Sequence, residues 1–307
     1  MKSKANESWD TTLNLRFKKV IHDSDVLSWI IHSNVDEFKD KSIDEIKACL
    51  DLGEDGCTVI GRDTEFGSPD HGRIQTDSIF DVIIPGTDEK VSIILNVEGQ
   101  SDPYPGYPIG KRAEFYVARM VSSQQGVYFT NDDYGNVRKT YSIWYILRPD
   151  LGKRNTAIRY RMKGENVVGN PKNPPVLETF NVLMVYVGGY DSSLPDETAF
   201  PAALFTKMDL QERQELMKSK FNITLRESII KEVNHMASLG EDTYNHGFRE
   251  GRAEGRAEGD VDTIKSTSQT IIRLVKEKGW ALDDAMSIVV VPDRLKEKVE
   301  KEVKKEL

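Results

Sequence analysis

The chain has 307 residues, of which 38% are hydrophobic and 30% are charged, so it can form one large domain with an appendage, or two domains. Because the formal net charge is −8, any contact with nucleic acid must come from a local basic patch. Cys49 and Cys57 lie in no metal-binding motif, and no apolar run approaches the length of a membrane span. We therefore expect a cytoplasmic protein without a disulfide framework, structural zinc or membrane contact.

The first fifty residues predict helices. Leu13, Phe17 and Ile21 recur at helical spacing, and a second helix is expected to begin after Asp23 or Ser24. The sequence SIDE, from Ser42 to Glu45, has the pattern of a capping box and predicts a third helix.

From residue 73 the pattern changes to that of strands. Residues 73–84 and 91–100 are expected to form two strands, joined by the turn-forming sequence PGTDEK. A helix is expected over residues 109–126, with Phe115, Val117 and Val121 towards a core and Gly126 as its C-cap. Further strands are expected at residues 139–147, 155–162 and 179–189. This order of elements predicts an α/β or α+β layered fold.

After Pro201 the sequence becomes helical and charged. The repeat GFREGRAEGRAEG has a period of four, which places Gly247, Gly251, Gly255 and Gly259 on one stripe of a helix. It is either a flexible linker or a helix that pairs with a second copy and makes a homodimer. We expect four regions, at residues 1–205, 206–246, 247–260 and 261–307, of which the last is a small helical region.

The sequence LNVEGQ ends an apolar strand with polar residues. Glu98 and Gln100 share one face of the strand, because alternate residues point to the same side. Asp77 and Asp81 share a face of the preceding strand, so the hairpin can bring carboxylates together. Carboxylates that converge repel one another unless a cation lies between them, and Mg²⁺ prefers such oxygen ligands. The alternative is an ordinary solvated strand end.

Part of the chain resembles the PD-(D/E)XK nuclease superfamily, and within it the recombination-promoting nuclease and transposase family of bacteria. The resemblance is carried by the sequences IFDVII, IILNVEGQ, YPGYPIGKRAEFYVARMVSSQQG and KTYSIWYI. The resemblance covers the chain from about the first helix to VLMVYVGG. It implies a restriction-endonuclease-like α/β core, a mixed sheet flanked by helices, with a helical C-terminal appendage. It also implies that Asp81 and Glu98 bind Mg²⁺ or Mn²⁺, and that Gln100 stands where many members have a catalytic lysine.

Two residues are candidates for the carboxylate that would bind the metal together with Glu98. Counting outwards from the centre of PGTDEK pairs Asp77 with Glu98, whereas the resemblance favours Asp81. An asymmetric loop or a bulge near Pro85 and Gly86 would bring Asp81 opposite Glu98, so we expect Asp81 to be the ligand and keep Asp77 as the reserve candidate. Glu37 is a further acidic candidate from the N-terminal helices, or else a solvated charge at a helix end.

Two groups of cations are candidates for contacts with DNA phosphates. Lys111 and Arg112 lie in the first turn of a predicted helix, where the helix dipole disfavours cations unless an anion is near. Arg159, Arg161 and Lys163 alternate along a strand and share one face, which fits either phosphate contacts or an exposed sheet surface.

The function that the resemblance implies is Mg²⁺-dependent hydrolysis of DNA by metal-activated water, linked to recombination or a mobile element. The alternative is a degenerate DNA-binding or assembly module with the same fold, and an RNA nuclease is a third reading. The sequence contains no Gly-rich phosphate loop, HExxH or GxSxG motif, so we expect no nucleotide cofactor.

Overall fold

The computed structural model describes residues 4–61, 65–68, 72–75, 78–84, 92–100 and 105–307, with the backbone alone described at residues 4–11, 65–68, 72–75, 92–100, 238–254 and 257. The chain divides into two compact units, Met1–Glu241 and Asp242–Leu307. The first unit extends beyond the predicted boundary at residue 205, because Phe221, Ile229 and Val233 from the following helices belong to its core.

The second and third N-terminal helices begin where the local signals place them. They are α1 (Lys4–Ile21), α2 (Ser24–Asn34), the short 3₁₀ helix η1 (Asp36–Phe38) and α3 (Ile43–Lys47). The Asp23 carboxylate accepts hydrogen bonds from the backbone N–H groups of Asp25 and Val26 and caps α2. Ser42 and Glu45 form the capping box of α3, which confirms that prediction.

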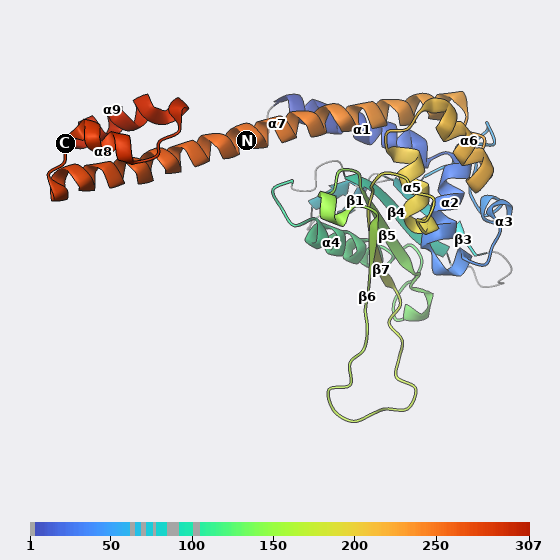
Figure 1. The fold of residues 1–307 in the computed structure, drawn as a ribbon. Coiled ribbons are helices and arrows are strands. Elements are labelled where there is room, and N and C mark those ends of the chain that lie inside the picture. The colour runs from blue at the N-terminus through green and yellow to red at the C-terminus, as the bar shows by residue number, and fades with distance from the viewer. Residues whose placement is uncertain (1–3, 62–64, 69–71, 76–77, 85–91, 101–104) are drawn as a thin grey trace. The chain divides into compact units, whose positions relative to one another are not determined.

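A five-stranded mixed sheet, in the order β3-β4-β5-β7-β6, lies at the centre of the first unit (Figure 1). Its strands are β3 (Ser78–Ile83), β4 (Ser92–Gln100), β5 (Thr140–Ile146), β6 (Thr156–Arg161) and β7 (Phe180–Tyr186). The β3–β4 and β6–β7 pairs are antiparallel, whereas β4, β5 and β7 run parallel to one another. A separate two-stranded sheet is formed by β1 (Glu65–Ser68) and β2 (Gly72–Gln75).

Helix α4 (Ile109–Ser122) connects β4 to β5 and covers one face of the sheet. Its buried residues Ala113, Val117 and Met120 pack with Trp144 and other residues of β3, β5 and β7. The expectation for Phe115 is wrong, because its side chain is 55% exposed. Two residues beyond Ala113, Phe115 falls about 200° around the helix from that residue and therefore on the outer side.

The end of α4 also differs from the prediction. The helix stops at Ser122 with Ser123 as its C-cap, and Gly126 instead adopts a left-handed conformation, with φ of +78°, in the turn that follows. That conformation favours glycine, which explains the residue without making it the helix cap.

The other face of the sheet is covered by α1, α2, α5 (Asp196–Phe205), α6 (Leu210–Phe221) and the start of α7 (Glu227–Lys278). Phe17, Ile30 and Phe200 from these helices pack with Phe80 and Tyr145 from the sheet. The first unit is thus a mixed α/β fold in which helices flank both faces of the sheet (Figure 1).

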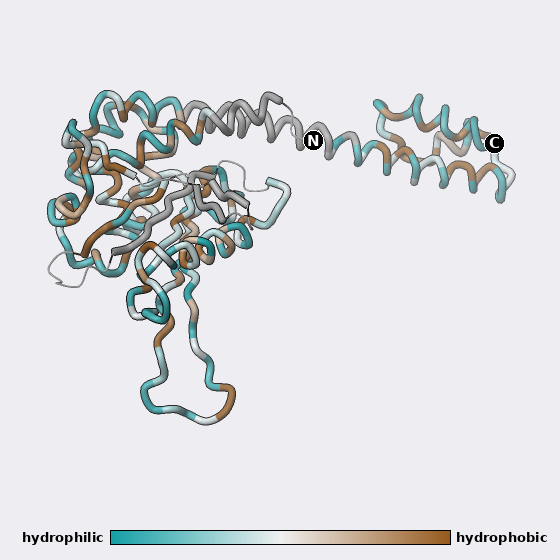
Figure 2. The backbone as a smooth tube through the Cα atoms, turned by 180° about the vertical axis from the view of Figure 1, so that it is seen from behind, coloured by the Kyte–Doolittle hydropathy of each residue, from teal (hydrophilic) through white to brown (hydrophobic). Residues whose placement is uncertain are grey.

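The loop between β6 and β7 extends away from the sheet and carries the exposed Val167 and Val168 (Figure 1 and Figure 2). The second unit contains the rest of α7, α8 (Leu282–Ile288), η4 (Asp293–Leu295) and α9 (Lys296–Glu306), which share a small core including Ile271 and Val299. Within the described part of the chain, no helix combines the length and apolar character needed to cross a membrane.

Candidate nuclease site

The register of the β3–β4 hairpin decides which aspartate can lie beside Glu98. Ser78 pairs with Val97 and Asp81 pairs with Ile94, with no bulge between them, so the expected register shift is wrong. Asp81 and Glu98 are on the same face, but four positions along β4 separate Ile94 from Glu98, roughly 13 Å at about 3.3 Å per residue. A metal ion binds its oxygen ligands at about 2.1 Å, so this separation disfavours a shared ion.

Asp77, the other aspartate, is one of the residues outside those described. In the sequence it directly precedes Ser78, just as Glu98 directly follows Val97, and those two neighbours are paired.

Asp81 has a polar environment of its own. It is half-buried, and its Oδ2 accepts a hydrogen bond of 2.8 Å from the hydroxyl of Tyr128, which follows α4 in the chain. The Arg138 guanidinium lies over the Tyr128 ring, 3.5 Å from the ring centroid. These contacts tie the middle of β3 to the segment between α4 and β5, which gives Asp81 a structural role.

The start of α4 brings a cation to the end of β4 that bears Glu98. The Arg112 guanidinium lies 4.9 Å from the ring centroid of Tyr116 and 5.3 Å from that of Trp144. Trp144 on β5 pairs with Glu98, and Ile146, two residues further along β5, pairs with Gln100. Arg112 is therefore next to the strand pair that ends in Glu98 and Gln100. Lys111, one residue earlier, is exposed and pairs with Glu114 at 2.7 Å.

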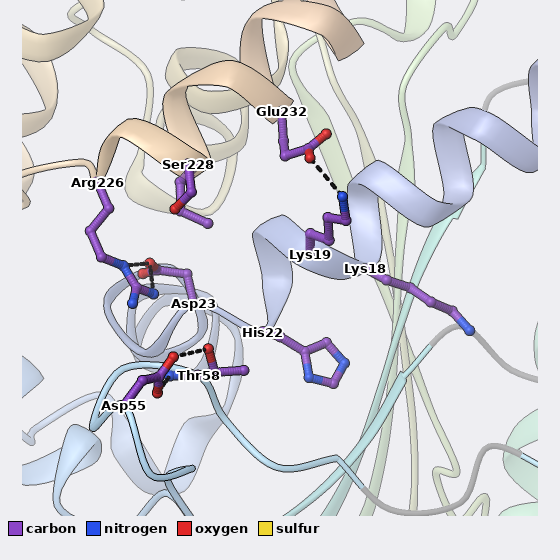
Figure 3. Close-up of a pocket in the computed structure, with 10 residues that line it drawn as sticks. Lys18, Lys19, His22, Asp23, Asp55, Thr58, Arg226, Ser228 and Glu232 are labelled. Carbon is purple, nitrogen blue, oxygen red and sulfur yellow. Dashed lines mark hydrogen bonds and ion pairs between the residues drawn. The ribbon is translucent and has the colours of Figure 1, made fainter.

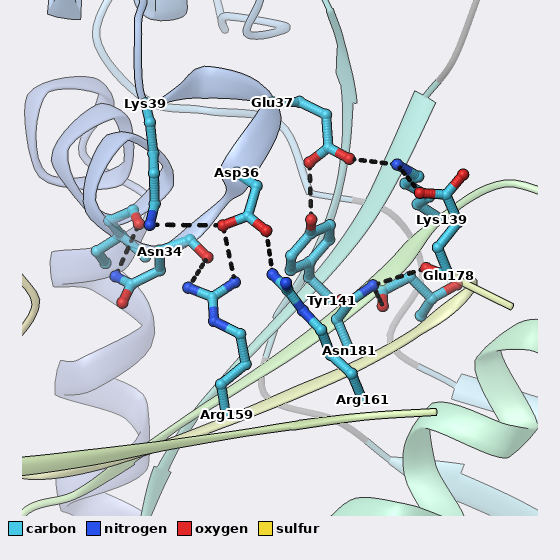
Figure 4. A network of polar contacts seen from close by, with 12 residues as sticks. Asn34, Asp36, Glu37, Lys39, Lys139, Tyr141, Arg159, Arg161, Glu178 and Asn181 are labelled. Carbon is cyan, nitrogen blue, oxygen red and sulfur yellow. Dashed lines mark hydrogen bonds and ion pairs between the residues drawn. The ribbon is translucent and has the colours of Figure 1, made fainter. Parts of the chain in front are cut away.

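The cations of β6 have partners within the chain (Figure 4). Arg159 donates to Asp36 Oδ1 at 3.3 Å and to the carbonyl of Asn34 at 3.0 Å, and Arg161 also pairs with Asp36. Burial alone would raise the pKa of Asp36, but the charges of Arg159 and Arg161 outweigh it and lower the pKa. Lys163 lies beyond the end of β6 and is exposed.

Glu37 is part of the same polar network (Figure 4) and is not brought to Glu98. Its carboxylate accepts a hydrogen bond of 2.7 Å from the Tyr141 hydroxyl and one of 2.8 Å from Lys139 Nζ. Tyr141 pairs with Leu95, near the start of β4, whereas Glu98 is three residues further along. Burial, and then the hydrogen bond to Glu37, raise the pKa of Tyr141, so its hydroxyl remains a donor to this carboxylate.

A cavity of about 470 Å³, away from the end of β4, lies between α1, the loop around Asp55 and the start of α7 (Figure 3). Asp23 pairs with Arg226, and Lys19 pairs with Glu232 at 2.9 Å. Most of its charged groups are thus engaged in joining helices, and we assign it no catalytic role.

The loop that follows β5 was not predicted from the sequence to lie near the candidate site. Arg148, Lys153 and Arg154 lie in it, close to the strand end that pairs with Gln100. The signal was present as three cations in the sequence LRPDLGKR, but only the sheet order shows that this loop neighbours the end of β4.

Among the described side chains, no group of three or more His, Cys, Asp or Glu residues could hold a metal ion. Glu98 and Asp77 are not among those side chains. Comparisons of the chain with protein-family models, with curated proteins and with solved structures find no match.

Proposed function

We propose that this protein is a Mg²⁺-dependent endonuclease of the PD-(D/E)XK type that hydrolyses phosphodiester bonds in DNA. The observation that best supports this function is the end of β4. There Glu98 and Gln100 are paired with Trp144 and Ile146, and Arg112 lies over the Trp144 ring. A carboxylate position and a guanidinium at one strand end suit a metal ion and a phosphate, respectively.

The second carboxylate of the site is proposed to be Asp77 rather than Asp81. The observed pairing of Ser78 with Val97 supports Asp77, because the residues next to that pair in the sequence are Asp77 and Glu98. Asp81 is displaced along the strand and accepts a hydrogen bond from Tyr128. Two carboxylates opposite each other provide the hard oxygen ligands that Mg²⁺ requires.

Each residue then has a defined task. Glu98 and Asp77 would hold the ion, which when bound lowers the pKa of a water molecule and stabilises negative charge on the phosphate. Gln100 can orient a water molecule through its amide but cannot supply the charge that a lysine would. Arg112 lies over the ring of Trp144, which pairs with Glu98, and can supply charge-assisted hydrogen bonds to a phosphate.

The fold is compatible with this proposal. A mixed sheet flanked by helices is what the resemblance to PD-(D/E)XK nucleases implies, and the stretch from IFDVII to KTYSIWYI that carries the resemblance contributes β3, β4, α4 and β5. By the same resemblance, the biological setting would be recombination or a mobile element.

The test is nicking of supercoiled plasmid with and without Mg²⁺. We expect cleavage that requires the metal and is abolished in Glu98→Ala and in Asp77→Ala. Asp81→Asn, which can still accept the hydrogen bond from Tyr128, should cleave nearly as well as the natural chain. If Asp81→Asn is inactive while Asp77→Ala cleaves normally, the assignment of the second carboxylate is wrong.

A degenerate DNA-binding module is the second candidate. It is favoured by Gln100, because a site that lacks lysine must obtain more of its charge stabilisation from the metal. Such a module would bind DNA without cleaving it at any concentration of Mg²⁺ or Mn²⁺, and its binding would not change in Glu98→Ala. Cleavage by the natural chain that Glu98→Ala loses would exclude this candidate.

A further inference from the structure

A pocket of about 320 Å³ opens beside the same strand ends as the proposed nuclease site. We call it the tyrosine pocket and define it by Tyr107, Ile146, Lys153, Tyr160, Met184 and Tyr186. Its volume is at the lower end of the range of about 300–1,000 Å³ that is usual for pockets of small ligands. It is therefore of a size to hold one flat ring.

The walls of the tyrosine pocket are aromatic and its floor is apolar. Ile146 and Met184 are buried, whereas Tyr107 and Tyr160 are 46% and 49% exposed. Tyr160 and Tyr186 both line the pocket, and burial, together with the neighbouring Tyr160, raises the pKa of Tyr186. Exposed aromatic rings over an apolar floor favour stacking with another ring, while the hydroxyls can form hydrogen bonds at its edge.

The tyrosine pocket is exposed because α4 covers only part of its face of the sheet. Helix α4 packs on β5 and β7, but Ile158 and Tyr160 on the edge strand β6 remain 43% and 49% exposed. The helical layer that engages Arg159 is on the opposite face of β6, because alternate residues of a strand point to opposite sides. The open side of this strand is thus the apolar one.

The surroundings of the tyrosine pocket are basic, although the chain as a whole has a net charge of −8. The two segments that border it, residues 105–112 and 147–155, contain five cations and one carboxylate, Asp150, which pairs with Lys153 at 3.0 Å, while Lys111 pairs with Glu114 just beyond the first segment. The cations are Lys111, Arg112, Arg148, Lys153 and Arg154. Arg112 also donates a hydrogen bond of 2.9 Å to the Tyr107 hydroxyl, which orients that ring. Positive charge around an aromatic pocket is the combination that binds single-stranded nucleic acid.

The position of the tyrosine pocket connects it to the proposed site. Ile146, in its floor, pairs with Gln100 at the last position of β4, and Trp144 two residues earlier pairs with Glu98. A DNA strand whose phosphate lies at Glu98 would have a neighbouring nucleotide close to these rings.

We propose that the tyrosine pocket binds an unpaired base of the DNA strand that is cut, so that the preferred substrate is single-stranded DNA or a duplex with an unpaired base. This inference rests on the proposed function for its choice of nucleic acid. Base stacking against Tyr107 and Tyr160 gives binding without strong sequence preference, because every base has a flat face. The surrounding cations contribute salt-dependent contacts with phosphates.

The test measures binding separately from cleavage, with the full chain in EDTA. The probes are a single-stranded oligonucleotide and a fully paired duplex of the same sequence, each with one 2-aminopurine whose fluorescence reports stacking. We expect the single strand to bind at least about tenfold more tightly than the duplex and its 2-aminopurine emission to change on binding. Equal affinity for the two probes would overturn the inference.

Variants locate the binding to these rings. Tyr107→Ala and Tyr160→Ala should each weaken binding of the single strand by about fivefold or more and leave binding of the duplex unchanged. Tyr160→Phe keeps the ring and should restore the affinity. Phe115→Ala removes an exposed ring of α4 outside the pocket and should have no effect. If Phe115→Ala weakens binding as much as the two tyrosine variants do, the pocket is not the site.

The two proposals fail in different ways. If the natural chain does not nick plasmid in Mg²⁺ but still prefers single strands in EDTA, the proposed nuclease activity is refuted and binding of an unpaired base by the tyrosine pocket remains supported. Metal-dependent nicking with no preference for unpaired bases would refute the pocket and leave the nuclease.

Discussion

Gly188, just after β7, lies in a close approach between two segments of the chain. A Cβ atom at this position would meet Asn155 Oδ1 at 2.6 Å and Arg154 Cβ at 2.7 Å. Asn155 is itself held by its backbone N–H, which donates to the Tyr186 carbonyl at 2.8 Å, and by its side-chain amide, which donates to the Gly189 carbonyl at 2.9 Å. The loop that borders the tyrosine pocket therefore cannot easily move away.

We expect Gly188→Ala to lower the free energy of unfolding of the first unit by about 1–3 kcal/mol, because overpacking forces backbone shifts. Gly189→Ala is the matched control, since a Cβ atom there would meet nothing within 4 Å. Urea denaturation of the two variants measures the difference. Equal stabilities would show that the loop yields to the added methyl group.

His22 links the end of α1 to the start of β3. The Val59 carbonyl can only accept, so His22 Nδ1 donates to it at 2.8 Å, and Nε2 is then free to accept from the Ser78 hydroxyl, also at 2.8 Å. Burial lowers the pKa of His22 below its ordinary value of 6.5, and the charge of Lys18 lowers it further, against the effect of the hydrogen bond to Val59. The imidazole is therefore neutral in the folded protein at pH 7.

A lowered pKa makes the folded state take up fewer protons than the unfolded state. The contribution of His22 to stability is complete above pH 6.5 and decreases as the pH falls from 6.5 towards the folded-state pKa, by at most about 1.4 kcal/mol per pH unit. In His22→Gln, the loss of unfolding free energy between pH 7.5 and pH 5.5 should be smaller than in the natural chain. Parallel pH profiles for the two proteins would contradict this assignment.

At the scale of elements, β6 is held to the N-terminal helical layer by Asp36 of η1. Asp36 bonds both Arg159 and Arg161, and all three side chains are partly exposed. The alternation of these arginines along the strand was predicted from the sequence, whereas their partner lies more than a hundred residues away in the chain. The structure therefore favours a stabilising role for them over contact with phosphates.

We expect Asp36→Asn to lower the free energy of unfolding by about 1 kcal/mol, and by less at high salt, because the pairs are partly solvated. Replacing Arg159 and Arg161 by Gln should likewise cost stability and leave the salt dependence of DNA binding nearly unchanged. The exposed Lys163→Gln serves as the control for stability. A decrease of about one unit of salt slope per arginine would restore these residues as phosphate contacts.

At the scale of the whole molecule, the chain consists of two units with separate cores, and the boundary between them lies inside α7. The Gly-Arg-Glu repeat lies within this helix, although each glycine costs about 1 kcal/mol relative to alanine. Packing of the glycine stripe against a second copy of the chain would offset that cost, which is one of the two roles that the repeat itself indicates.

The test replaces Gly255 and Gly259 by alanine. In a single chain a Cβ atom at either position meets nothing within 4 Å, so the double variant would stabilise an isolated helix. In a dimer packed along the stripe, the added methyl groups would separate the two helices. We expect light scattering to show a dimer for the natural chain and weaker association for the double variant. A monomeric natural chain, or unchanged association, would exclude this contact.

The sequence by itself determined most of the elements in this protein. Ser42 caps the helix it was expected to cap, Asp23 is one of the two residues expected to cap α2, and the strands predicted at 139–147 and 179–189 end within three residues of their predicted ends. These features depend on neighbours a few residues apart, through capping hydrogen bonds and side-chain periodicity. The LNVEGQ ending of β4 was also visible in the sequence as the candidate site.

Only the tertiary structure decided what those elements bring together. Counting outwards from the turn agrees with the observed register, in which Asp81 lies opposite Ile94, whereas the resemblance favoured a shifted register with Asp81 opposite Glu98, and the structure decided between the two. The packing of helices on both faces of the sheet turned Arg159 towards Asp36 and left Tyr160 exposed on the other side of β6. The choice between two registers and the packing of the layers depend on contacts between residues distant in sequence, which turn residues and side-chain periodicity do not specify.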